Sequence, residues 1–169
     1  MKLFAQLPGA VAMACLFLSY QQKNRKGRIT YKLSADVFWA LHYALLGAYG
    51  GMIPNLSGIF REIVFVNREN KKWASCHIWP VFFIVLNFSF GLLSYKSTIN
   101  LLPITASAFV TISLWLKNTR LTRIISVPVS LSFFIYDIFA GSYIGMVNEG
   151  LAVLSIIIYF LKKENRNDK

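Results

Sequence analysis

Seven apolar stretches fill most of this chain and leave only short connectors between them. They cover residues 3–20, 33–53, 54–67, 73–94, 100–116, 124–141 and 143–161. Most approach the roughly 17–25 residues that a helix needs to cross about 30 Å of hydrocarbon. With 56% hydrophobic and 15% charged residues, the chain is also too apolar for a soluble domain of 169 residues. The pattern predicts an all-α integral membrane protein with a single membrane domain.

Basic residues decide how many stretches cross the membrane, because Lys and Arg collect in short cytoplasmic connectors. The third stretch has only 14 residues and contains Arg61 and Glu62, so its own composition is ambiguous. If it crosses, 15 Lys and Arg residues lie on one side, only Lys2 and Lys96 lie on the other, and Arg61 is inside the membrane. This segregation predicts seven transmembrane helices, with the N-terminus outside and the C-terminus in the cytoplasm. The net charge of +11 therefore indicates membrane orientation, and nucleic acid is not an expected partner.

The first stretch has one alternative interpretation, a cleaved signal peptide. Lys2 precedes an apolar run that leads to Ala12, Met13 and Ala14, a pattern such peptides share. Pro8 interrupts the run, however, and the hydrophobicity continues as far as Leu18. A first transmembrane helix is the preferred interpretation.

The chain matches itself when it is shifted by 94 residues. Nine of the identities that result without a gap pair Ala12, Ala14, Ser19, Lys23, Asn24, Gly47, Tyr49, Gly51 and Met52 with Ala106, Ala108, Ser113, Lys117, Asn118, Gly141, Tyr143, Gly145 and Met146. The shift predicts two parallel three-helix repeats, residues 1–68 and 99–162, joined by a linker helix within residues 69–98 and followed by a basic tail at 163–169. Parallel repeats are related by an axis along the membrane normal, and transporters built in this way bind their solute between the halves.

Two resemblances follow from these features. The arrangement of three helices, one linker helix and three helices is similar to that of the SWEET and PQ-loop superfamily, which implies a transporter-like fold. The chain also resembles, over nearly its whole length, the YgjV family of bacterial inner-membrane proteins. The residues that carry this resemblance are Leu45-Leu46-Gly47-Ala48-Tyr49, Leu101-Leu102-Pro103, Ala140-Gly141-Ser142, Glu149-Gly150 and Arg61. It implies an inner (plasma) membrane location and leaves the substrate open.

Ionisable residues inside the predicted helices are the best pointers to a site, because each costs about 2.5–3.5 kcal/mol at the bilayer centre. On the sixth stretch a helical period places four polar or small residues on one face: Ser126, Ser130, Asp137 and Gly141. The 94-residue shift carries the last three onto Asp36, Tyr43 and Gly47, again on one face. These stripes are either walls that face each other across a solute path or polar contacts that settle helix packing. For Asp36 alone we favour a structural role, as a favourable charge in the first turn of its helix.

Arg61 and Glu149 lie at similar predicted depths, about 13 and 9 Å from the outer ends of their helices. We therefore expect an ion pair between them beside a central cavity, with Asp137 as the alternative partner of Arg61 and Glu62 directed elsewhere. Such a pair would gate the cavity or bind a polar solute. The structural alternative is that it only locks the two halves together.

The sequence thus predicts a facilitator that moves a small polar solute by alternating access at the repeat interface. The residues expected to line or gate its path are Asp137, Arg61, Glu149, Tyr43, Asn55 and Ser130. The rival class is a non-transporting assembly or sensory protein of the bilayer, whose buried charges are structural. No catalytic triad, phosphate loop or metal-ligand spacing is found, so we expect no enzyme activity, metal or cofactor. A single chain supplies both halves, so a dimer is not required.

Overall fold

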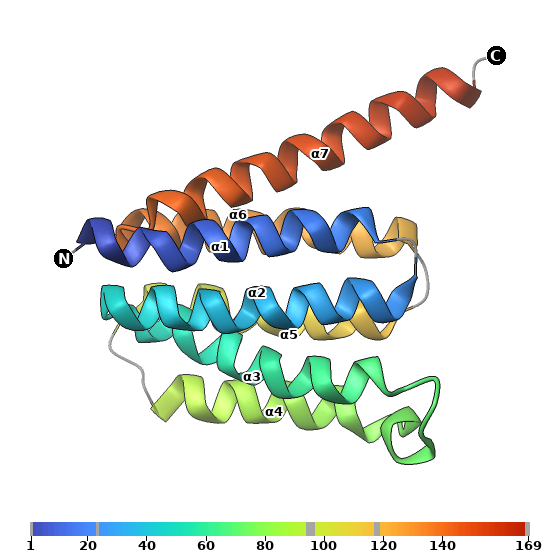
Figure 1. Cartoon of the computed structure of the whole chain (residues 1–169), viewed down its shortest axis with the longest axis horizontal. Helices are drawn as coiled ribbons and strands as arrows, with labels where there is room; N and C mark the ends of the chain where they lie inside the picture. Colours follow the sequence, from blue (N-terminus) through green and yellow to red (C-terminus); the bar gives the residue numbers. More distant parts are fainter. Residues whose placement is uncertain (1, 23, 94–96, 117–118, 168–169) are drawn as a thin grey trace.

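Seven α-helices make up the described part of the chain. The computed structural model describes residues 2–22, 24–93, 97–116 and 119–167, and these contain no strand. The helices are α1 Lys2–Gln21, α2 Arg25–Leu46, α3 Tyr49–Val66, α4 Ile78–Leu93, α5 Leu101–Trp115, α6 Thr119–Ala140 and α7 Tyr143–Asn167, with short 3-10 turns η1 Lys72–Ser75 and η2 Thr98–Asn100 (Figure 1). The predicted number of helices is confirmed. Several residues used in the charge and repeat analysis lie outside the described residues: Lys23, Lys96, Lys117, Asn118 and Lys169.

The predicted border between the second and third stretches, at Pro54, is wrong. Helix α2 begins at Arg25 and ends at Leu46, and α3 begins at Tyr49. Gly47 ends α2 because it adopts a left-handed conformation with φ of 69°, which glycine reaches without a Cβ penalty. Pro54 lies within α3, where its missing N–H removes one hydrogen bond of the helix. Helix α3 therefore has 18 residues, whereas the predicted third stretch has 14.

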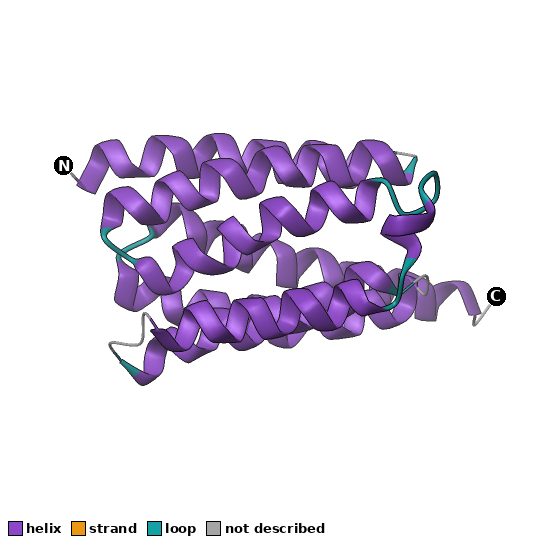
Figure 2. Cartoon of the chain, turned by 90° about the horizontal axis from the view of Figure 1, so that it is seen from below, coloured by secondary structure: helices purple, strands orange, loops and turns teal. Residues whose placement is uncertain are grey.

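The helices run antiparallel to their sequence neighbours, and two further contacts join the halves of the chain (Figures 1 and 2). Helix α2 packs between α1 and α3, and α6 packs between α5 and α7. The halves meet where α3 packs on α5 and where α1 packs on α7, while α4 contacts α3 and α5. We call the end that carries the α1–α2, α3–α4 and α5–α6 connections the basic end. Toward this end α7 diverges from the other helices (Figure 1).

Polar side chains occupy the interior of the bundle, and large apolar side chains cover its outside. Glu62 and Asp137 are 0% exposed, whereas Leu3 and Leu93 are more than 80% exposed. This distribution is unfavourable in water but suits a hydrocarbon solvent, in which only the polar groups need protein partners. Three segments of the described chain are long and apolar enough to cross a membrane: Thr98–Trp115, Leu121–Ala140 and Tyr143–Leu161.

Candidate functional site

Two groups of polar side chains lie in the interior, one in each half of the bundle's length. The first, which we call the charge cluster, consists of Lys32, Asp36, Arg61 and Glu62 and lies toward the basic end. The second, which we call the Tyr43–Asp137 centre, consists of Tyr43, Asp137, His42, Tyr136 and Ser142 and lies toward the opposite end. Each group includes side chains of α2 that contact residues of other helices.

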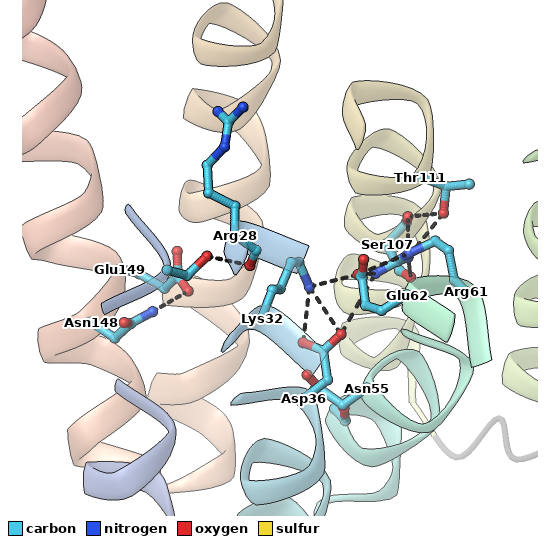
Figure 3. A network of polar contacts seen from close by, with 12 residues as sticks. Arg28, Lys32, Asp36, Asn55, Arg61, Glu62, Ser107, Thr111, Asn148 and Glu149 are labelled. Carbon is cyan, nitrogen blue, oxygen red and sulfur yellow. Dashed lines mark hydrogen bonds and ion pairs between the residues drawn. The ribbon is translucent and has the colours of Figure 1, made fainter. Parts of the chain in front are cut away.

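The charge cluster joins α2 to α3 by ion pairs. Nζ of Lys32 lies 2.9 Å from both carboxylate oxygens of Asp36 and 3.1 Å from Oε1 of Glu62. Nη2 of Arg61 lies 3.1 Å from the same Glu62 oxygen and 3.9 Å from Oδ2 of Asp36 (Figure 3). Two cations thus face two anions, and this balance is what makes burial of four charges tolerable in a low-dielectric interior.

Helix α5 completes the surroundings of Arg61. Nη1 of Arg61 donates to Oγ1 of Thr111 at 3.0 Å and to the Ser107 hydroxyl at 3.4 Å (Figure 3). On the α2 side, Gly58 leaves room for the Asp36 carboxylate, because a Cβ at that position would collide with it. Since α5 belongs to the second half of the chain, the charge cluster also ties that half to the first.

The expected ion pair between Arg61 and Glu149 is wrong, and so is the alternative with Asp137. Arg61 pairs with Asp36 and with Glu62, although the Glu62 side chain was expected to point elsewhere on the helix. Residue i+1 points about 100° away on a helix, yet the long arginine side chain turns back far enough to reach Glu62. Asp36 lies in the fourth turn of α2 and is buried, so the expected first-turn role is also wrong.

Glu149 and the remaining predicted site residues lie in separate local contacts. The Glu149 carboxylate accepts a hydrogen bond from the side-chain amide of Asn148 at 2.9 Å (Figure 3), and the Ser130 side chain is near enough to act on its charge. Asn55 donates to the Gly51 carbonyl one turn earlier in α3, at 2.7 Å. These two residues therefore do not join Arg61, although Ser130 is buried on the interior face, as its stripe predicted.

The Tyr43–Asp137 centre is where the two polar stripes meet. The Tyr43 hydroxyl donates to Oδ1 of Asp137 at 2.8 Å, and both side chains are almost fully buried. The Tyr43 ring also contacts the Tyr136 ring edge to face, with centroids 6.0 Å apart. Oδ2 of Asp137 has no hydrogen-bond partner among the described residues. An ionisable group with one bonded oxygen and one free oxygen is thus held in the protein interior.

His42 links this centre to α1 and α7. Its Nδ1 lies 2.6 Å from the Ala5 carbonyl oxygen, and its Nε2 lies 2.8 Å from the Ser142 hydroxyl. Gly9 of α1 provides room for the imidazole, because a Cβ there would approach Nδ1 to 2.9 Å. Gln6 adds a second bridge, since it donates to the Gly141 carbonyl at 3.1 Å and accepts from the Ile144 amide at 3.2 Å.

The two turns beside this centre have the same geometry. Gly47 and Gly141 have φ values of 69° and 70°. The amide after each glycine donates to a carbonyl five residues earlier, from Ala48 to Tyr43 at 2.9 Å and from Ser142 to Asp137 at 3.0 Å. Each turn therefore ends a helix in the same left-handed manner and starts the next helix two residues later.

A polar pocket of about 360 Å³ opens at the end of the bundle opposite the basic end. It is lined by Leu46, Gly47, Ala48, Ser97, Ile99, Asn100, Tyr136, Phe139 and Ala140. Tyr136 is shared between the pocket and the Tyr43–Asp137 centre, where its hydroxyl accepts from the Gly51 amide at 2.8 Å. The pocket thus ends one aromatic ring away from Tyr43.

Sequence reasoning missed several residues of both groups. Lys32 falls just before the second predicted stretch, although its spacing of four residues from Asp36 is a signal for a pair on one helix face. His42 lies within that stretch without metal-ligand spacing, so the pattern predicts no role for it. Ser142, Gln6 and Thr111 carry no charge, and no pattern in one sequence distinguishes them from other polar residues of membrane helices.

Comparison with known proteins gives one family. No curated protein and no solved structure matches the chain. A family model described as bacterial inner membrane protein, Imp-YgjV, matches residues 3–167. This match spans all seven helices, and it agrees with the apolar outer surface and with the resemblance found in the sequence. The chain belongs to the YgjV family of bacterial inner membrane proteins.

Proposed function

We propose that this protein moves a small polar solute across the bacterial inner membrane by alternating access between two three-helix repeats. The observation that carries the proposal is the hydrogen bond from Tyr43 to Asp137. These residues are 94 positions apart, so they occupy the same place in the two proposed repeats. Equivalent positions touch each other only near the axis that relates two copies, which is where parallel-repeat transporters bind their solutes.

Reciprocal contacts support the repeat relation. His42 of the first half reaches Ser142 in the α6–α7 turn, and its equivalent, Tyr136, reaches Gly51, three residues after Ala48, the position equivalent to Ser142. The helix contacts are reciprocal as well, because α1 on α7 and α5 on α3 exchange equivalent partners. The turns at Gly47 and Gly141 match in φ and in hydrogen bonding. Together these pairs support a two-fold axis through the centre, along the membrane normal.

The placement of the two polar groups supports a path that opens at one end at a time. The polar pocket leads from the end opposite the basic end to Tyr136, while the charge cluster ties α2, α3 and α5 together in the other half. We assign the basic end to the cytoplasm, because Lys and Arg favour that side. In this state the path is open outward as far as Tyr136 and closed inward. Opening to the cytoplasm requires Arg61 to leave Thr111 and Ser107.

A second candidate is a non-transporting membrane protein whose polar interior fixes helix packing. The complete burial of Asp137 favours it, because Tyr136 and not Asp137 lines the polar pocket. Membrane helices do associate through interhelical hydrogen bonds of this kind. The two candidates differ in whether Asp137 is needed for activity or only for the stability of the fold.

Solute uptake into liposomes that contain the purified protein separates the candidates. The panel comprises sugars, polyols, amino acids and small organic ions. We expect at least one solute to enter, and we expect Asp137→Asn to abolish its entry while the protein remains folded, because the substitution keeps the shape and removes the ionisable carboxyl group. Glu69→Gln, at an exposed position near the basic end, is the matched control and should retain uptake. If the folded protein moves no solute on the panel, the second candidate stands.

A further inference from the structure

We propose that Asp137, Ser142 and His42 form a proton-binding relay, with the Ser142 hydroxyl between the carboxylate and the imidazole. The inference rests on the proposed function in one respect, because the proton would be the ion that the same interface couples to solute movement. The relay itself is a property of the folded protein and can be measured without any solute.

The hydrogen-bond partners of His42 determine where its protons lie. The Ala5 carbonyl oxygen can only accept, so Nδ1 of His42 carries a hydrogen in every state. In the neutral imidazole Nε2 is then an acceptor, and the Ser142 hydroxyl, 2.8 Å away, donates to it. The Ser142 oxygen meanwhile accepts from the Gly145 amide at 3.2 Å. While His42 is neutral, Ser142 has therefore no hydrogen left for Asp137.

The free oxygen of Asp137 completes the relay. Oδ2 of this fully buried carboxyl group has no hydrogen-bond partner among the described residues, whereas Oδ1 is bonded to Tyr43. A Cβ at Gly145 would collide with both Oδ2 of Asp137 and the Ser142 hydroxyl, so the two oxygen atoms border the same small space. Burial of a charged carboxylate with one oxygen lacking a hydrogen-bond partner is energetically unfavourable. A proton on Oδ2 that is directed at the Ser142 oxygen removes this cost.

One proton can then move between the two residues without leaving the site. The proton on Oδ2 of Asp137 passes to the Ser142 oxygen while the Ser142 hydrogen passes to Nε2 of His42. The products are a carboxylate and an imidazolium, the serine is unchanged, and the total charge is conserved. Because His42 lies on α2 and Asp137 on α6, the transfer carries the proton between the two halves of the chain.

Few other ionisable groups face the relay. Tyr43 on α2 donates to Asp137, Tyr136 precedes it on α6, and Glu149 on α7 is near enough to act on it electrostatically. Helix α1 contributes the Ala5 carbonyl and the uncharged Gln6. With no basic side chain among these neighbours, the proton itself is the species that neutralises Asp137.

Infrared and NMR titrations of the purified protein test the relay. We expect the carboxylic acid band of Asp137 and the imidazole signals of His42 to titrate together, as interacting groups do. The band is identified by its loss in Asp137→Asn. We expect Ser142→Ala to separate the two titrations and Ser142→Thr, which keeps the hydroxyl, to restore their coupling. Gln6→Leu is the control, because it removes neighbouring hydrogen bonds without touching the relay and should leave the coupling intact.

Three outcomes distinguish the relay from the proposed function. Coupled titration in a protein that moves no solute leaves the relay standing and contradicts the transport proposal. Solute uptake that a proton gradient drives in the wild type, but not in folded Ser142→Ala, supports both. If Asp137 keeps one protonation state from acid to alkaline pH, or if Ser142→Ala titrates as the wild type does, the relay is overturned.

Discussion

The Arg61 guanidinium is held by oxygen atoms from three helices, and its neighbours bring two negative charges and one further positive charge. Asp36 approaches it from α2, Glu62 from α3 and Thr111 from α5. Removing one member of such a balanced group leaves an uncompensated charge, whereas removing a cation and an anion together does not. The charge cluster therefore acts as a unit, and the cost of a substitution depends on the net charge that remains.

Substitutions of Arg61 and Glu62 test this dependence. We expect Arg61→Leu to lower the free energy of unfolding by about 3–5 kcal/mol, because it leaves two buried carboxylates with one lysine. The double variant Arg61→Leu with Glu62→Leu keeps the Lys32–Asp36 pair and should recover more than half of that loss. Denaturation in mixed micelles measures both, with the exposed Lys71→Ala as a control. A double variant that is less stable than Arg61→Leu would show that net charge does not govern the cluster.

The partners of Arg61 also show what one sequence can and cannot predict. Hydrophobic length and charge segregation indicated seven helices, and helical periodicity placed Asp137 and Tyr43 on interior faces, as the structure has them. Which side chains meet depends on how each helix is rotated and shifted against its neighbours. The sequence gives only an estimate of depth along the membrane, and by depth alone Arg61 and Glu149 are expected to pair. In the structure Arg61 instead contacts Asp36 of α2 and Thr111 of α5.

At the scale of the elements, the helix boundaries depend on two glycines. We predicted the border between the second and third helices at Pro54, because proline disfavours a continuous helix. Pro54 nevertheless lies within α3. The actual break lies at Gly47, and the same break recurs at Gly141. Both positions need a left-handed backbone, and a Cβ at either would meet no other atom within 4 Å. Backbone conformation, not space, is thus what selects glycine here.

Alanine substitutions at these two turns should have equal effects. We expect Gly47→Ala and Gly141→Ala each to lower the free energy of unfolding by roughly 1–2 kcal/mol, the cost of a left-handed conformation for a residue with a Cβ. Gly150→Ala is the matched control, since Gly150 lies within α7 with open space around it and should gain slightly from alanine's helix propensity. Thermal unfolding in detergent ranks the three. If one of these two substitutions lowers the free energy of unfolding and the other does not, the proposed equivalence of the two turns is contradicted.

For the whole molecule, the remaining question is which end of the bundle faces the cytoplasm. The apolar outer surface and the family place the chain in the inner membrane, and the two ends differ in charge. At the basic end the exposed residues Arg28, Lys71 and Lys72 would face anionic lipid headgroups. At the other end the polar pocket would face the periplasm. This orientation also decides the direction in which a proton gradient would act on Asp137.

The native cysteines allow the orientation to be measured. Cys76 is exposed between η1 and α4 at the basic end, whereas Cys15 is half-buried in α1. We expect a membrane-impermeant thiol reagent to label Cys76 in inverted vesicles and not in intact spheroplasts, because the proposed topology places the basic end in the cytoplasm. Ser97→Cys in a Cys15→Ala, Cys76→Ala background supplies the opposite control, since Ser97 is exposed beside the pocket and should be labelled only in spheroplasts. The reverse labelling pattern would invert the topology and place the pocket on the cytoplasmic side.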